Sequence, residues 1–193
     1  WYFYTIDLLL QGNQKLAYPI LGVLIGLIWN FNAALILLTF LIPIAQFLSK
    51  KKLKLKPLAL GIGTLFITSL PLILFEFRHN FSQSRALYTA LTTESRAIVY
   101  GLEKVRQVIH LASKNVSGVI WGDISGISYE TTAFLLLLLL VALLIKKIFS
   151  KNQAIIMTLW LLIYLVFFSN YGIILSEYYL NGTMVIFIAI ITL

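Results

Sequence analysis

The stretch that decides the fold is Leu70-Pro71-Leu72-Ile73-Leu74-Phe75-Glu76-Phe77-Arg78-His79-Asn80-Phe81, in which a long apolar run meets an acid, a base and a histidine. Apolar residues begin near Pro57, and a bilayer core of about 30 Å needs about 20 of them to be crossed as a helix. The sequence therefore predicts a membrane span over about 57–76, with Glu76 to His79 at its rim. Ionisable side chains at that depth are costly and usually serve a function.

Composition favours a membrane protein over a soluble one. The chain is 60% hydrophobic and 11% charged, with a mean hydropathy of +0.93, whereas about a quarter of the residues in an average soluble domain are charged. We therefore expect an all-α fold, a polytopic transmembrane helix bundle lodged in the lipid bilayer. The chain has no cysteine, which removes disulfides and thiolate chemistry and leaves the redox compartment undetermined.

Lysines are grouped along the chain in a way that predicts topology. A net charge of +8 would suggest nucleic acid in a soluble chain, but here we expect no nucleic-acid partner, because loop lysines mark the cytoplasmic face of a membrane protein. The grouped lysines are Lys15, Lys50, Lys51, Lys52, Lys54, Lys56, Lys146, Lys147 and Lys151, with no acid among them. The acids assigned to the opposite face are Glu76, Glu94, Glu103, Asp123, Glu130 and Glu177.

The remaining apolar runs complete the predicted bundle, a single transmembrane domain over 1–193. The predicted spans are about 1–10, 16–29, 33–48, 57–76, 131–146, 153–170 and 181–193. Two short helices in a hairpin are favoured over one long tilted helix between 16 and 48, because Trp29-Asn30-Phe31-Asn32 interrupts the run and a hairpin returns the chain to the side of Lys15. We also expect a fragment of a longer protein, since the chain starts at Trp1 and stops in an apolar run too short to span. Close helix packing is predicted at Gly22, Gly26, Gly61 and Gly63.

A non-spanning external loop is predicted over about 77–130, and part of it has helical periodicity. Apolar residues recur at Ile98, Leu102, Val105 and Ile109. The other face carries Glu103, Lys104, Arg106, Gln107 and His110. We expect an amphipathic interfacial helix over 95–112, with its apolar face toward lipid or the bundle.

Polar clusters at the external ends of the spans are the candidate substrate-binding residues. They are Glu76, Arg78 and His79 after one span and Glu177 and Tyr178 before the last apolar run, and they are predicted to line one external pocket. A guanidinium such as that of Arg78 matches phosphate oxygens in a two-pronged fork. In the alternative interpretation, Arg78 reaches the lipid head groups with Glu76 as its ion-pair partner, and the tyrosines belong to an interfacial aromatic belt.

The two histidines, His79 and His110, are too few and too far apart in sequence for a metal-ligand motif. We therefore expect no metal site, and the sequence indicates no cofactor.

Three stretches resemble a known family: Leu21-Gly22-Val23-Leu24-Ile25-Gly26-Leu27-Ile28-Trp29-Asn30-Phe31-Asn32, the stretch from Leu70 to Phe81, and Ser176-Glu177-Tyr178-Tyr179-Leu180. In order and pattern they resemble the central part of a polytopic glycosyltransferase of the C superfamily, in the branch of prokaryotic homologues of protein O-mannosyltransferases and aminoarabinose transferases. The resemblance implies an enzyme that moves a sugar from a polyprenyl phosphate to an acceptor on the external face of a prokaryotic plasma membrane. It also implies a catalytic acid in a first external loop, which would precede Trp1, so no residue of this chain is assigned as catalytic.

Two other classes of function stay open. One is a glycolipid flippase, polymerase or other multi-span transporter without glycosyl transfer, and the other is a structural membrane subunit. Apart from Asp7, no predicted span carries an ionisable residue in its interior, which disfavours ion-coupled transport and favours chemistry at the membrane surface.

Overall fold

The computed structural model describes residues 1–92, 101–122, 128–170 and 177–183, and every regular element in these ranges is a helix. The prediction of an all-α chain is therefore confirmed for the described residues. The chain divides into two compact units, Trp1–Thr89 (unit 1) and Ala90–Leu193 (unit 2), and each is described by itself. The single transmembrane domain over 1–193 stays a prediction.

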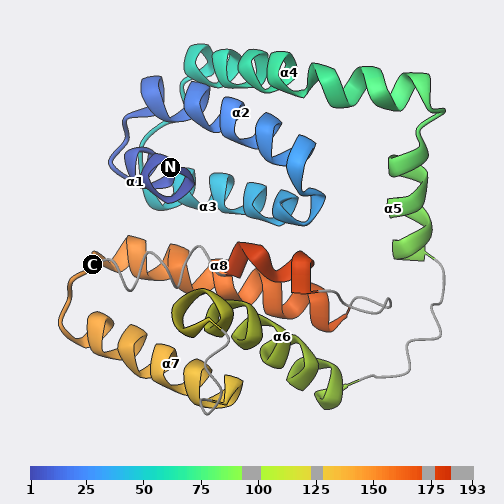
Figure 1. Cartoon of the computed structure of the whole chain (residues 1–193). Coiled ribbons are helices and arrows are strands. Elements are labelled where there is room, and N and C mark those ends of the chain that lie inside the picture. Colours follow the sequence, from blue (N-terminus) through green and yellow to red (C-terminus); the bar gives the residue numbers. More distant parts are fainter. Residues whose placement is uncertain (93–100, 123–127, 171–176, 184–193) are drawn as a thin grey trace. The chain divides into compact units, whose positions relative to one another are not determined.

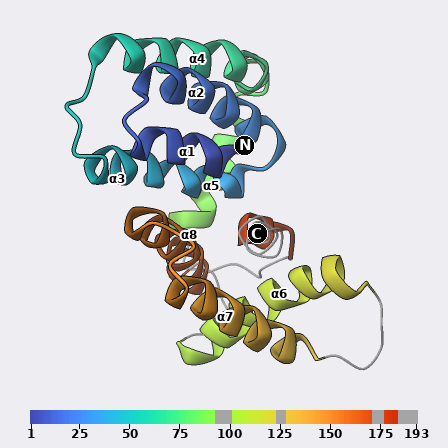
Figure 2. The same ribbon diagram turned by 90° about the vertical axis from the view of Figure 1, so that its left-hand side faces the viewer.

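Unit 1 is organised around one central helix. Its elements are α1 (Tyr2–Leu10), α2 (Gln14–Phe31), the 3-10 helix η1 (Ala33–Phe40), α3 (Leu41–Leu48), α4 (Leu55–Arg78) and the start of α5 (Ser82–Thr92). Helix α2 contacts α1, α4 and η1, and it lies between α4 and the η1–α3 segment (Figure 1, Figure 2). At the end of α4 the chain turns sharply into α5 (Figure 1).

Glycines allow α2 and α4 to pack closely. A Cβ added to Gly22 would collide with the carbonyl oxygen of Gly61 and the hydroxyl of Thr64, and one added to Gly61 would lie 2.7 Å from the carbonyl oxygen of Tyr18. The Thr64 hydroxyl uses this closeness to donate a 3.0 Å hydrogen bond to the carbonyl of Pro19 on the facing helix. Small residues with hydroxyls that bond across the interface are typical of helix packing in membranes.

The same pattern continues one turn further and then ends. A Cβ on Gly26 would collide with the Thr68 hydroxyl, whereas one on Gly63 would meet no atom within 4 Å. The predicted role in close packing is thus confirmed for Gly22, Gly26 and Gly61 and wrong for Gly63. Gly63 is exposed on α4, so its lack of a side chain serves no contact with the described residues.

The predicted hairpin between 16 and 48 is present, with its break at Asn32. This residue is extended (φ −152°, ψ 102°), and its side-chain oxygen accepts a 3.0 Å hydrogen bond from the backbone N–H of Ala34, which caps η1. A hydrogen bond joins α3 to α2, because the Tyr18 hydroxyl donates to the side-chain oxygen of Gln46 at 2.9 Å. A single long helix over this range is therefore wrong.

The turn before α2 is bonded to the lysine-rich loop before α4. The Gln14 side chain donates to the carbonyl of Lys52 and accepts from the backbone N–H of Lys54, each at 2.9 Å. Gly12, with φ +84°, lies against the side chain of Lys51, where an added Cβ would be 2.8 Å from Cγ. Lys15 and the lysines of the later loop therefore lie at the same end of unit 1, as the hairpin predicts.

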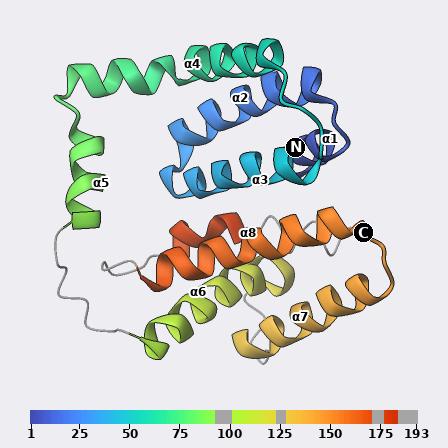
Figure 3. The same ribbon diagram turned by 180° about the vertical axis from the view of Figure 1, so that it is seen from behind.

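Unit 2 contains α6 (Leu102–Trp121), α7 (Tyr129–Ile145), α8 (Lys151–Ser169) and the 3-10 helix η2 (Glu177–Leu180). Helix α6 contacts α7, α8 and η2 (Figure 3). The core is built on α8, whose Trp160, Tyr164 and Phe168 are almost fully buried. Trp160 donates a 3.0 Å hydrogen bond to the carbonyl of Gly182, which ties the segment after η2 to α8.

Two described helices are long and apolar enough to cross a membrane, Leu55–Arg78 and Lys151–Ser169. The apolar helices Ala34–Leu48 and Tyr129–Leu143 are shorter. Helix α4 leaves large apolar side chains exposed along its length, including Leu60, Ile62, Phe66, Ile67, Leu70 and Leu74. An exposed apolar face of this kind marks contact with lipid or another protein. The predicted last span over 181–193 falls mostly outside the described residues.

The predicted amphipathic helix over 95–112 needs correction. Residues 93–100 lie outside the described part, and α6 runs from Leu102 to Trp121, past the predicted end. Leu102, assigned to the apolar face, is 88% exposed, whereas Lys104, assigned to the polar face, is 3% exposed. Its position beside η2 and α8 within unit 2 makes α6 part of a helix bundle, and its placement at a membrane surface stays a prediction.

The physical reason for the different face lies in Lys104, which a periodicity counts as polar although the fold buries it. This burial lowers the pKa of its amine. Beyond the predicted end at 112, the buried face of α6 continues with Ser113 and Ser117, and the Ser113 hydroxyl donates a 2.7 Å hydrogen bond to the carbonyl of Ile109 in its own helix.

Candidate functional site

The α4–α5 turn is built on the backbone of Glu76. The Glu76 carbonyl accepts a 2.8 Å hydrogen bond from the N–H of Phe81, which closes the end of α4. In this turn, Asn80 (φ 52°) and Phe81 (φ 57°) adopt left-handed backbone conformations. Such conformations are costly outside glycine and are found where surrounding contacts hold them, often at functional sites.

The Glu76 side chain fixes the start of α5. Its carboxylate accepts hydrogen bonds from the backbone N–H groups of Gln83 (3.1 Å) and Ser84 (2.9 Å) and from the Ser84 hydroxyl (2.5 Å). The residue is only 7% exposed. A carboxylate that accepts from the first N–H groups of a helix satisfies donors that the helix itself leaves unpaired. Glu76 is therefore a helix-capping group that reaches across the turn.

Arg78 and His79 are exposed at the end of α4. The His79 ring stacks on Phe75 with 4.0 Å between centroids, and its Nδ1 lies 2.8 Å from the Phe75 carbonyl oxygen. A carbonyl only accepts, so Nδ1 donates, and Nε2 is left for another group. Within the described residues no ion pair joins Glu76 to Arg78. Glu76 therefore orients α5, and the guanidinium stays open to solvent.

A cavity of about 370 Å³ lies beside this turn in unit 1. Its walls come from the end of α2 (Trp29), from η1 (Ile36), from the second half of α4 and from the α4–α5 turn. Apolar side chains form most of its surface, with Leu72, Ile73 and Phe77 among them, and Glu76 supplies a carboxylate. The cavity thus combines a hydrocarbon wall with one acidic group.

Two buried polar atoms on residues that line this cavity have no hydrogen-bond partner among the described residues, namely Nε1 of Trp29 and Oγ of Ser69. Ser69 is 2% exposed. Neither residue is among the site residues predicted from the sequence, although the interruption from Trp29 to Asn32 was a signal for Trp29. Ser69 gave no signal, because a serine inside an apolar span usually bonds its own helix.

Glu177 and Tyr178 belong to η2 in unit 2, and their side chains lie outside the part of the chain that the structure describes. The predicted convergence with Glu76, Arg78 and His79 on one pocket therefore stays a prediction.

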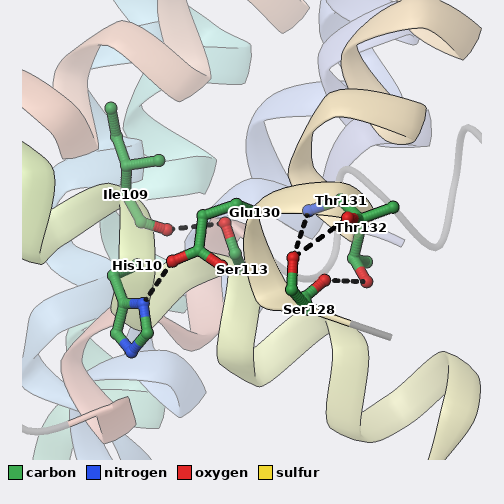
Figure 4. A network of polar contacts seen from close by, with 7 residues as sticks. All are labelled: Ile109, His110, Ser113, Ser128, Glu130, Thr131 and Thr132. Atoms are coloured by element: carbon green, nitrogen blue, oxygen red, sulfur yellow. Dashed lines mark hydrogen bonds and ion pairs between the residues drawn. The ribbon is translucent and has the colours of Figure 1, made fainter. Parts of the chain in front are cut away.

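A second polar cluster, in unit 2, joins the middle of α6 to the start of α7 (Figure 4). His110 Nδ1 lies 3.2 Å from a carboxylate oxygen of Glu130, and the His110 ring meets Tyr129 edge-on at 5.3 Å. The backbone N–H of Glu130, followed by the His110 ring, lowers the pKa of the Glu130 carboxyl. Both side chains are exposed, so the contact between His110 and Glu130 is a surface contact that links α6 to α7.

No group of three or more His, Cys, Asp or Glu side chains in the described residues is placed to hold a metal ion. Unit 2 also has a groove of about 330 Å³ between α6, α7 and α8, lined almost entirely by apolar side chains such as Val108, Leu136 and Leu161. Such a groove can accommodate hydrocarbon but offers no chemistry. The end of α4 is therefore the better candidate for a functional site.

Comparisons of the chain with protein-family models, with curated proteins and with solved structures found no match.

Proposed function

We propose that this chain is part of a multi-pass glycosyltransferase of a prokaryotic plasma membrane, which moves a sugar from a polyprenyl-phosphate donor to an acceptor on the extracytoplasmic face. One observation carries the proposal. At the end of the longest apolar helix, an apolar cavity with one carboxylate adjoins a turn that exposes an arginine and a histidine.

This combination suits a lipid-linked sugar, because the three parts of that molecule need three environments. The polyprenyl tail needs hydrocarbon, and the exposed apolar face of α4 provides it. The phosphate sits at head-group depth, where the guanidinium of Arg78 and Nε2 of His79 are open to it. The sugar needs polar groups close to the membrane, and Glu76 supplies one.

In the proposed reaction, an acceptor hydroxyl forms a new bond to the anomeric carbon as the bond between that carbon and the phosphate oxygen breaks. The phosphate leaves with the electron pair, and a carboxylate takes the hydroxyl proton. No residue of this chain is assigned as that base. Arg78 would stabilise the charge that grows on the leaving phosphate, a role for which one positioned hydrogen-bond donor is typically worth about 10²–10³ in kcat.

The transporter alternative makes a different demand on the spans. A pathway for ion-coupled movement places ionisable groups inside the helices. In the two helices long enough to span, Leu55–Arg78 and Lys151–Ser169, every charged side chain lies within the first or last turn. This distribution favours chemistry at the membrane surface.

The test is transfer of labelled sugar from a polyprenyl-phosphate donor in membranes that contain the protein. Arg78→Lys keeps the charge and loses the two-pronged fork, so we expect transfer to fall about tenfold, and Arg78→Ala to lower it about a hundredfold. Arg85→Lys is the matched control, since Arg85 is an exposed arginine on the next helix. If both Arg78 variants keep wild-type transfer and affinity for the sugar donor, the proposal is wrong.

A further inference from the structure

Lysines at one end of unit 1 form a positively charged surface, the lysine patch. It consists of Lys15, Lys50, Lys51, Lys52, Lys54 and Lys56. All of these side chains are exposed, and none of their ammonium groups forms an ion pair with a described residue. The acid nearest to the patch in sequence is Asp7, whose carboxylate accepts a 2.6 Å hydrogen bond from the side-chain amide of Gln11. The patch therefore attracts anions.

Two glutamines fix the backbone that carries the patch. Gln14, which is 2% exposed, donates to the carbonyl of Lys52 and accepts from the backbone N–H of Lys54, each at 2.9 Å. Gln46 donates a 2.7 Å hydrogen bond to the carbonyl of Lys51. An amide side chain makes such bonds without adding a charge, whereas a carboxylate would offset part of the positive charge. The fold thus holds the lysines together and leaves their charge available to a partner.

The patch lies at the start of α4, which is long and apolar enough to cross a membrane. A helix of 24 residues extends about 36 Å, and the hydrocarbon core is about 30 Å thick, so both ends of such a helix reach the lipid head groups. Lys54 and Lys56 flank the first residue of this helix, Leu55. Lysines at that depth meet the phosphates of the adjoining leaflet.

Exposed leucines alternate with the lysines where α4 begins. Leu53 is 48% exposed and Leu55 is 77% exposed, and they separate Lys52, Lys54 and Lys56 in the sequence. Leucine side chains can enter hydrocarbon while the lysine stems carry their ammonium groups to the head groups. A soluble anion or a nucleic acid supplies charge without hydrocarbon, so it would leave both leucines in water. The alternation therefore favours a lipid surface.

We propose that the lysine patch binds anionic phospholipids of the adjoining leaflet, with the ammonium groups on the lipid phosphates and Leu53 and Leu55 among the upper acyl chains. A lysine acts on a phosphate as a compact point charge, so the patch recognises the net charge of the lipid and not the shape of its head group. This inference goes beyond the proposed function and does not depend on sugar transfer.

The chain offers a matched control for the test. The patch variant combines Lys51→Gln, Lys52→Gln and Lys54→Gln, which keep the backbone groups that Gln14 and Gln46 bind. The control variant removes the same amount of charge from exposed lysines of unit 2 through Lys146→Gln, Lys147→Gln and Lys151→Gln. A third protein, the arginine variant, replaces the lysines of the patch variant with arginine and so keeps their charge. Thermal unfolding in detergent checks that each variant folds.

The measurement is binding of the first lipid to the purified protein, followed by native mass spectrometry. The probes are phosphatidylglycerol, which is anionic, and phosphatidylcholine with the same acyl chains, which has no net charge. We expect the wild-type protein to bind phosphatidylglycerol at least tenfold more tightly than phosphatidylcholine. The patch variant should bind phosphatidylglycerol at least tenfold more weakly, since one lysine near an anionic surface is worth about fivefold in affinity. Its binding of phosphatidylcholine should be unchanged.

The control variant and the arginine variant should bind phosphatidylglycerol within about threefold of the wild-type protein, because each keeps the charge of the patch. A folded patch variant that retains the wild-type preference would show that the proposal is wrong. An equal loss in the control variant would also contradict it, because net charge and not the patch would then be the cause. If the patch variant does not fold, Lys52→Gln alone serves the same test, with an expected loss of about fivefold.

A final arm separates a lipid from a soluble anion. Glycerol phosphate and a single-stranded oligonucleotide are added to the wild-type protein at the phosphate concentration of the lipid. We expect neither to displace phosphatidylglycerol, because neither supplies hydrocarbon for Leu53 and Leu55. Displacement by either one would make the patch a site for a soluble anion and would overturn the assignment to lipid.

Discussion

The Ser84 hydroxyl donates a 2.5 Å hydrogen bond to the carboxylate of Glu76, and the Ser84 backbone N–H donates a second one of 2.9 Å. The pair spans the turn in which Asn80 and Phe81 have positive φ. Both residues also line the cavity, so the same two residues hold the turn and form part of the wall of the candidate site. A substitution that loosens the turn should therefore also change the cavity wall, and a change in the wall should also affect the turn.

Loss of the Ser84 hydroxyl should loosen the start of α5. We expect Ser84→Ala to increase hydrogen exchange at the backbone amides of positions 83 and 84, because the carboxylate loses its shortest contact and the cap weakens. The measurement is exchange followed by mass spectrometry on the peptide that covers the turn. Ser82→Ala is the control, since Ser82 is exposed and its hydroxyl makes no side-chain hydrogen bond in the described residues. Equal exchange in the two variants would count against the cap.

Close packing of α2 and α4 should make Gly22 intolerant of substitution. We expect Gly22→Ala to destabilise the protein by about 1–3 kcal/mol, because the added methyl group collides with the Gly61 carbonyl and the Thr64 hydroxyl. Gly63→Ala should be neutral or stabilising by up to about 1 kcal/mol, since alanine favours helix and the site is open. Unfolding in denaturant, compared across the two variants, measures the difference. The reverse order would contradict the interface.

Helix α6 gives a comparison in which structure and periodicity disagree. Lys104→Glu should lower the unfolding temperature more than Leu102→Glu, because Lys104 is 3% exposed and Leu102 is 88% exposed. A glutamate at position 104 would place a carboxylate in a buried environment that disfavours charge, whereas one at position 102 would be solvated. Thermal unfolding of the two variants in detergent measures the difference. A larger fall in unfolding temperature for Leu102→Glu would support the face assigned from the sequence.

The Glu130 carboxyl should contribute to stability at neutral pH and cease to do so in acid. Its pKa is lowered in the folded protein by its own backbone N–H and then by the His110 ring, so the unfolded chain binds the proton more readily. The contribution is present above the unfolded pKa of about 4.3 and is lost as the pH falls through the folded pKa. Glu130→Gln should therefore reduce the acid-induced fall in unfolding temperature. Identical acid profiles for the wild type and Glu130→Gln would contradict the assignment.

Topology can be tested directly, because the chain has no cysteine of its own. We expect Lys52→Cys to react with a membrane-impermeant thiol reagent only after the cells are permeabilised, and Ala86→Cys to react in intact cells. Labelling of the two variants before and after permeabilisation measures this. The opposite pattern would reverse the predicted orientation.

Apolar runs and their interruptions were sufficient to predict most helices. The break at Asn32 and the run that became α4 were visible in the sequence, because length and hydropathy are local properties. The cavity wall that Trp29 and Glu76 share was not visible in the sequence, since periodicity does not show which helices pack together. Ser84 as the partner of Glu76 was missed for the same reason, because the bond depends on a turn with two positive φ values. The buried face of α6 was missed because periodicity counts Lys104 as polar, whereas packing within unit 2 buries it and leaves Leu102 exposed.

The double hydrogen bond of Gln14 to the lysine-rich loop has a consequence for membrane insertion. The Gln14 side-chain amide donates to the carbonyl of Lys52 and accepts from the N–H of Lys54, as the backbone of a paired strand would. It therefore holds together the two ends of the hairpin that lies between Gln14 and Lys52. Residues 16–49 contain no charged side chain. Insertion of this hairpin into a bilayer would therefore carry only neutral amides across at its tip, and it would translocate no lysine.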